Sequence, residues 1–73
     1  MSNSIVEGIA NQLALDALKA AKDHDNDQIV EEVGEILGAT SSTTQESYRT
    51  FIRVHRASSR ARQYLARLEA PKS

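Results

Sequence analysis

The sequence predicts an all-α protein, a three-helix chain with short first and second helices and a long third helix, forming a homodimeric helical bundle. Apolar residues recur at intervals of three and four, which is the spacing of helices with one buried face. Helix-capping patterns precede each periodic stretch. With three glycines and one proline in 73 residues, few breaks are expected. This length has room for one domain, so residues 1–73 are predicted to form a single helical domain.

The first helix is predicted over residues 5–23. Ser4 and Glu7 match a capping box, in which the Ser hydroxyl accepts from the Glu7 amide and the Glu7 side chain reaches back. The apolar stripe that follows has helical spacing, and Ala10, Ala14 and Ala21 widen it. Its main members are Ile5, Val6, Ile9, Leu13, Ala17 and Leu18.

The second helix is predicted over residues 27–37, after the polar segment DHDND. Asp25 with Gln28 three residues later offers a second cap. Gly34 is expected to weaken this helix by about 1 kcal/mol relative to Ala, and Gly38 is expected to end it. One clean apolar face is formed by Ile29, Val30, Val33, Ile36 and Leu37.

The third helix is predicted over residues 44–69, with Thr43 and Glu46 as its capping box. At 1.5 Å per residue this helix is about 39 Å long, whereas a compact chain of this size is nearer 30 Å across. Its end should therefore extend past the rest of the fold, and a second copy of the chain is the simplest cover. The predicted dimer and packing seam consists of Phe51, Val54, Ser58, Ala61, Leu65 and Leu68.

The composition excludes several kinds of chemistry. The chain has no cysteine and two histidines, His24 and His55, which are not at ligand spacing. DHDND begins like a calcium loop, but Gln28 and Gly34 stand where such a loop needs glycine and glutamate, so a capping linker is favoured. No nucleophile motif or glycine-rich phosphate loop occurs. We therefore expect no enzyme, no metal, no cofactor and no small-molecule substrate.

The location of the protein follows from what the chain lacks. The N-terminus has no basic leader of the kind that precedes a secretory signal. No apolar run approaches the roughly 18 residues that cross a membrane. We expect a cytoplasmic protein without a membrane partner.

Charge is strongly divided between the two halves of the chain. Residues 1–38 hold eight carboxylates and two lysines, net −6, and residues 39–73 are net +5, which gives the overall −1. At about 100° per residue, five of the six arginines fall within about 60° of one another on the third helix, and Arg62 lies elsewhere. These like charges repel, so a partner that supplies carboxylates or phosphates is expected. The predicted partner-binding residues are Arg49, Arg53, Arg56, Arg60 and Arg67.

Residues 29–48, IVEEVGEILGATSSTTQESY, resemble the helix-turn-helix pattern of DNA-binding proteins over about 20 residues. Gly34 stands where the two helices would cross, and Gly38 stands in the turn. Thr44 and Ser47 occupy places where that family buries aliphatic residues. The resemblance implies base or phosphate contacts from Ser42, Thr43, Gln45 and Arg49.

Two functions remain open at this stage. The first is a small, dimeric, non-catalytic protein that acts as a protein–protein interaction or regulatory module through the arginines or an exposed apolar patch. The alternative is a helix-turn-helix-like DNA-binding regulator that uses residues 29–48 together with the arginines. Against the alternative stand the acidic N-terminal half and a pI near 6.1, which weaken the field that attracts DNA.

Overall fold

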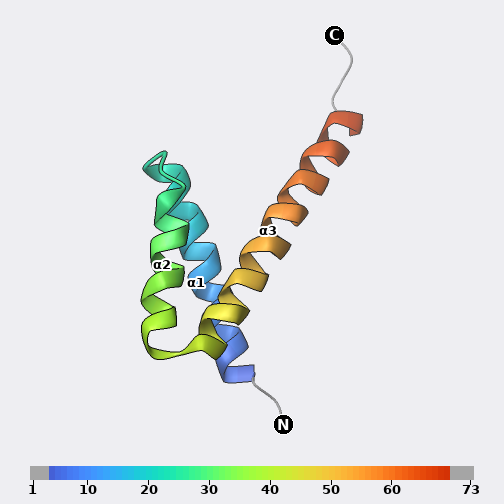
Figure 1. Cartoon of the computed structure of the whole chain (residues 1–73). Helices are drawn as coiled ribbons and strands as arrows, with labels where there is room; N and C mark the ends of the chain where they lie inside the picture. The colour runs from blue at the N-terminus through green and yellow to red at the C-terminus, as the bar shows by residue number, and fades with distance from the viewer. Residues whose placement is uncertain (1–3, 70–73) are drawn as a thin grey trace.

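The computed structural model describes residues 4–69, and in this range the chain is helical with no strand (Figure 1). Its three helices are α1 (Ser4–Asp23), α2 (Gln28–Thr40) and α3 (Ser42–Glu69). The predicted all-α class with two shorter helices and a long third one is confirmed. All three helices pack against one another, with α3 crossing α1 and α2 near its N-terminal end (Figure 1).

Both interhelical connections differ in detail from the predicted caps. Before α2, the Asn26 Oδ1 accepts the Gln28 amide at 3.0 Å, while Asp25 adopts a left-handed conformation with φ of 51°. Before α3, the Ser41 Oγ accepts the Thr44 amide at 3.1 Å. Because Ser41 caps the helix, α3 begins at Ser42, two residues before its predicted start.

The prediction that Gly38 ends the second helix is wrong. Helix α2 continues to Thr40, and it ends at Ser41, whose backbone is extended and whose amide donates to the Leu37 carbonyl at 2.8 Å. Gly38 instead gives room to α3, since a Cβ at this position would lie 2.7 Å from the Gln45 Cδ. The glycine therefore serves a close approach between helices rather than a turn.

The core is narrower than the apolar stripes suggest. On α1 the buried strip is made of alanines, whereas Ile5 and Ile9 expose 78% and 53% of their surface. Alanines at intervals of three and four let the backbones of neighbouring helices come close, which turns the larger aliphatic side chains to the flank. The buried core residues are Ala10, Ala14, Ala17, Ala21, Val30, Tyr48 and Ile52.

Helix α3 extends past α1 and α2, as predicted from its length (Figure 1). Every residue from 56 to 69 is exposed. The radius of gyration is 14.8 Å and the longest dimension is 52 Å, compared with a radius of about 11 Å expected for a compact chain of this size. Across residues 4–69, none of the helices has both the length and the apolar character needed to cross a membrane.

Candidate partner-binding surface

Helix α3 carries three faces, separated by roughly 90–160° at about 100° per residue. The inward face, with Tyr48 and Ile52, packs on α1 and α2. The arginine face consists of Arg49, Arg53, Arg56, Arg60 and Arg67, all exposed. The outward face consists of Val54, Ala57, Ser58, Ala61, Tyr64, Leu65 and Leu68, also all exposed. Only the inward face is used by the fold of one chain.

Two polar contacts on the inward face fix the rotation of α3 relative to α2. The Tyr48 hydroxyl donates to the Val30 carbonyl at 2.8 Å, and the Gln45 amide donates to the Gly34 carbonyl at 2.9 Å. Burial raises the pKa of Tyr48 above its ordinary value, and the Glu31 carboxylate raises it further, while the Arg56 guanidinium acts in the opposite direction. Because both side chains reach α2 backbone, α3 cannot turn about its axis without losing these bonds.

A third polar contact fixes α3 against α1. His55 is half-buried, and its Nε2 lies 2.6 Å from the Asn11 Oδ1. The His55 ring also stacks beside Phe51, with centroids 6.4 Å apart and planes 26° from parallel. His55 is therefore a half-buried, hydrogen-bonded residue at the edge of the inward face.

The sequence reasoning missed the two residues that hold α3 in the core. Tyr48 and Ile52 are both buried, but neither belongs to the predicted seam. A signal was present: these residues are four apart, and Gln45 and His55 extend the same stripe in both directions. The longer, more apolar seam obscured this short stripe.

The predicted seam does not pack within one chain. Of its six residues only Phe51 lies against the core, where it is half-buried. Val54, Ser58, Ala61, Leu65 and Leu68 are exposed on the outward face. The reason is geometric, since the contacts of Tyr48, Gln45 and His55 turn this side of α3 away from α1 and α2. That the seam packs between two copies of the chain stays a prediction.

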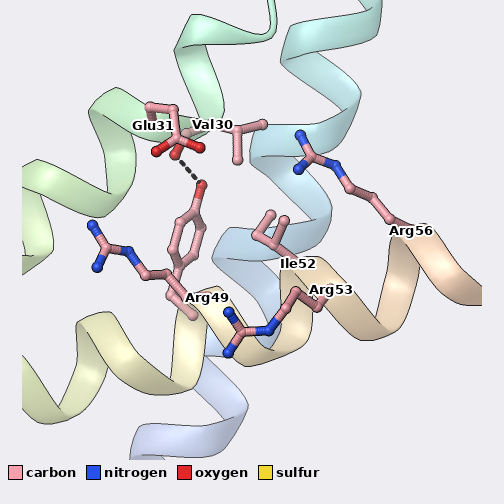
Figure 2. A pocket seen from close by; sticks show the side chains of 7 residues that line it. Val30, Glu31, Arg49, Ile52, Arg53 and Arg56 are labelled. Carbon is pink, nitrogen blue, oxygen red and sulfur yellow. Dashed lines mark hydrogen bonds between the residues drawn. The ribbon is translucent and has the colours of Figure 1, made fainter.

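The arginine face borders a cavity of about 200 Å³ between α2 and α3, shown in Figure 2. Three guanidinium groups, those of Arg49, Arg53 and Arg56, project from successive turns of α3 around it (Figure 2). Tyr48 and Ile52 contribute apolar surface to the cavity, together with Val30 and Glu31 from α2. The cavity therefore combines cationic side chains with an apolar wall.

The remaining arginines lie further along α3. Arg60 lines a second, open depression with Arg56 and with acidic residues of the interhelical linker and α2, namely Asp25, Asp27 and Glu31. Arg67 lies on the part of α3 that extends past the fold. Arg62 stands apart, as predicted, on the side that faces α1, with Leu15 and His55.

The acids near the arginine face do not form ion pairs with it. Within residues 4–69, the ion pair that forms within 4.0 Å is Lys19–Asp23, at 2.8 Å. This pair raises the pKa of Lys19 and lowers that of Asp23. Glu31 lies at the rim of the cavity, so the chain's own carboxylates approach the arginine face only along one edge.

Of the residues suggested for DNA contact, some are accessible in the structure and one is bonded within the fold. Ser42, Thr43 and Arg49 lie on the first turns of α3, where Thr43 and Arg49 are exposed and Ser42 lines a shallow surface depression with Thr43. Gln45 is half-buried and bonded to the Gly34 carbonyl, so its side chain is committed to the contact between α2 and α3. Ser41 is the single non-helical residue between these two helices, which makes a very short connection.

Neither a metal site nor a relative gives a further indication of function. In the part of the chain that the structure describes, no three or more His, Cys, Asp or Glu side chains are grouped so as to hold a metal ion. No protein-family model matches the chain, and no curated protein and no solved structure matches it. The function must therefore be argued from the faces of α3 themselves.

Proposed function

We propose that this protein is a non-catalytic interaction module that dimerises through the outward face of α3 and offers its arginine face to an acidic protein partner. The observation that carries the proposal is the exposure of large apolar side chains along one side of the extending helix. Val54, Tyr64, Leu65 and Leu68 expose 53%, 58%, 54% and 65% of their surface. A contiguous apolar strip of this kind is typical of an interaction site.

The marginal stability of the extending part of α3 also favours a partner along the outward face. Residues 56–69 have no buried member, and a free helix shorter than about 12–15 residues is only marginally stable in water. Packing along the outward face would supply the tertiary contacts that this segment lacks. The arginine face lies beside it, so a dimer formed there would leave the guanidinium groups accessible.

The expected dimer is weak. Covering the exposed half of each large outward side chain contributes about 1–1.5 kcal/mol, half of the roughly 2–3 kcal/mol for full burial. Two copies together would gain about 8–12 kcal/mol from four such side chains each, against an association cost of about 4 kcal/mol, the low end of its range. The dissociation constant should therefore lie between about 1 µM and 1 mM.

Sedimentation equilibrium between about 1 µM and 1 mM protein, the range expected for this dissociation constant, tests the dimer. Wild type should change from monomer to dimer over this range, and the Leu65→Ser/Leu68→Ser variant should stay monomeric with the helical circular dichroism of dissociated wild type. Ile36→Ser is the matched control, since Ile36 is 70% exposed on α2 and its loss should leave association unchanged. A wild-type protein that is monomeric at the highest concentration would refute the proposal.

DNA binding is the second candidate function, and the exposure of Thr43 and Arg49 beside the three-arginine cavity favours it. The probe is a random-sequence duplex of about 20 base pairs, titrated at about 50 and 200 mM salt. Micromolar binding that falls steeply with salt, and that disappears when Arg49, Arg53 and Arg56 are replaced by alanine, would support this candidate. Absence of binding at the lower salt concentration, with binding of polyglutamate that the same triple variant loses, would support the acidic protein partner.

A further inference from the structure

The outward face of α3 has a spacing that reads the same in both directions from Ala61. Moving out from Ala61, the next positions are Ser58 and Tyr64, then Ala57 and Leu65, and finally Val54 and Leu68. If two copies of α3 lie antiparallel with Ala61 facing Ala61, every residue of the outward face in one copy therefore faces a residue of the outward face in the other. The orientation argued here rests on the proposed function, because it presupposes the dimer proposed there.

The side chains that would meet in this alignment are complementary in size. Leu65 would face Ala57 of the second copy, and Tyr64 would face Ser58, so each of these contacts joins a large side chain to a small one. Close packing favours such alternation across a helix interface. In a parallel pair, each residue would face its own copy. Alanine would then meet alanine at position 57 as well as at position 61 and leave a gap there, while Tyr64 and Leu65 would crowd against their own copies.

We propose that two copies of the chain associate through α3 in antiparallel orientation, on a two-fold axis that passes between the Ala61 residues. Small residues at the centre would let the helix axes approach to about 8 Å, the close end of the usual range. The face from Val54 to Leu68 is about 21 Å long and about 10 Å wide. That is well short of the roughly 800 Å² per partner of a standard interface, which fits a second copy held in a weak, concentration-dependent dimer.

The two-fold axis has a consequence for the arginine face. Because the axis is perpendicular to both helices, the same side of each copy lies on the same side of the dimer. The two arginine faces would merge into one basic surface of ten arginines, about 36 Å long from Arg49 to Arg49 of the second copy. In a parallel dimer these faces would lie on opposite sides. The antiparallel dimer thus offers a basic surface that fits an extended acidic surface on a partner. The dissociation constant of the dimer should fall as added salt screens the repulsion between arginines.

Disulfide trapping tests the orientation in the full chain, which has no cysteine of its own. The variants are Ala61→Cys, Val54→Cys and Leu68→Cys, and all three positions are exposed, so the fold of one chain should be unaffected. With Cα atoms about 2.3 Å from each helix axis and an interaxial distance of about 8–10 Å, facing Cα atoms lie about 3.4–5.4 Å apart, and the upper part of this range meets the roughly 4.4–6.8 Å that a disulfide spans. Each variant, and an equimolar mixture of Val54→Cys with isotope-labelled Leu68→Cys, is oxidised with oxidised glutathione at about 200 µM protein, within the expected range of the dissociation constant, and analysed by mass spectrometry.

The antiparallel dimer predicts that Ala61→Cys links to itself and that the mixture gives the mixed disulfide at least about fivefold over either homodisulfide, because only facing positions come within bonding distance. Ser59→Cys, exposed on another side of α3, measures the background from random collision. Predominant Val54→Cys and Leu68→Cys homodisulfides would overturn the antiparallel orientation in favour of a parallel one. The protein could sediment as a dimer that the Leu65→Ser/Leu68→Ser variant loses, while every disulfide yield stays at the background level. That result would overturn the Ala61-centred register. A monomer by sedimentation would instead refute the proposed function.

Discussion

Removal of a single hydroxyl group, in the variant Tyr48→Phe, tests how α3 is held against α2. Tyr48 is 1% exposed and its hydroxyl donates to the Val30 carbonyl at 2.8 Å. Phenylalanine keeps the packing of the ring and removes this bond. A buried neutral hydrogen bond contributes about 1 kcal/mol to stability. For a chain of this length, that loss should lower the midpoint of thermal unfolding by about 4–8 °C.

The pH dependence of the same variant gives a second readout. Burial raises the pKa of Tyr48 in the folded state, with Glu31 adding to the effect. The neutral phenol is therefore favoured by folding, and its contribution is fully present below the unfolded pKa of about 10. It is lost as the pH rises above that value through the folded pKa. Wild type should thus lose stability above about pH 10 more steeply than Tyr48→Phe does.

Urea unfolding followed by far-ultraviolet circular dichroism measures both effects, with wild type and variants compared at the same protein concentration so that the expected dimer contributes equally to each. Tyr64→Phe is the matched control, because Tyr64 lies on the same helix and is 58% exposed. It should change the free energy of unfolding by less than about 0.5 kcal/mol. If Tyr48→Phe is as stable as wild type at neutral pH, the bond to Val30 does not hold α3 in place, and the account of its three faces fails.

Two further predictions concern the close contacts of the fold. Gly34→Ala should stabilise the protein by about 0.5–1 kcal/mol in urea unfolding, since its new Cβ would lie an ordinary 3.5 Å from the nearest ring carbon. Gly38→Ala should show no such gain, because the methyl group displaces the Gln45 side chain from its bond to the Gly34 carbonyl; an equal gain in both variants would contradict this. Ala14→Leu should destabilise the chain by about 1–3 kcal/mol, since Ala14 has no exposed surface and a larger side chain must displace its neighbours in the core. Wild-type thermal stability in the Ala14→Leu variant would show that the alanine strip is loosely packed.

Features that depend on nearby residues were predicted well from the sequence. Helix α1 begins one residue before its predicted start and ends where expected, because periodicity and caps are local signals. The extension of α3 followed from its length alone. Gly38 was misjudged because a glycine near the end of a helix usually supplies a left-handed turn, whereas here it leaves space for Gln45 on the next helix.

The candidate site was predicted in composition but not in arrangement. The arginine face could be found by plotting residues around one helix, and it is exposed as a continuous stripe. The cavity bordered by Arg49, Arg53 and Arg56 could not be found in this way, because its other wall comes from Val30 and Glu31 on α2. Pairing residues from two helices requires their relative rotation, and no local pattern specifies it.

The sequence by itself determined that the chain forms three helices, that the third is too long for the fold, and that its positive charge gathers on one side. Only the tertiary structure decided which apolar stripe of α3 enters the core. Two stripes compete, and the longer one, from Val54 to Leu68, is more apolar. Tyr48 and Ile52 are buried instead, because their stripe includes polar groups that bond to the α1 side chain of Asn11 and to α2 backbone carbonyls. Periodicity counts apolar residues, but the satisfaction of buried polar groups depends on partners that only the assembled helices provide.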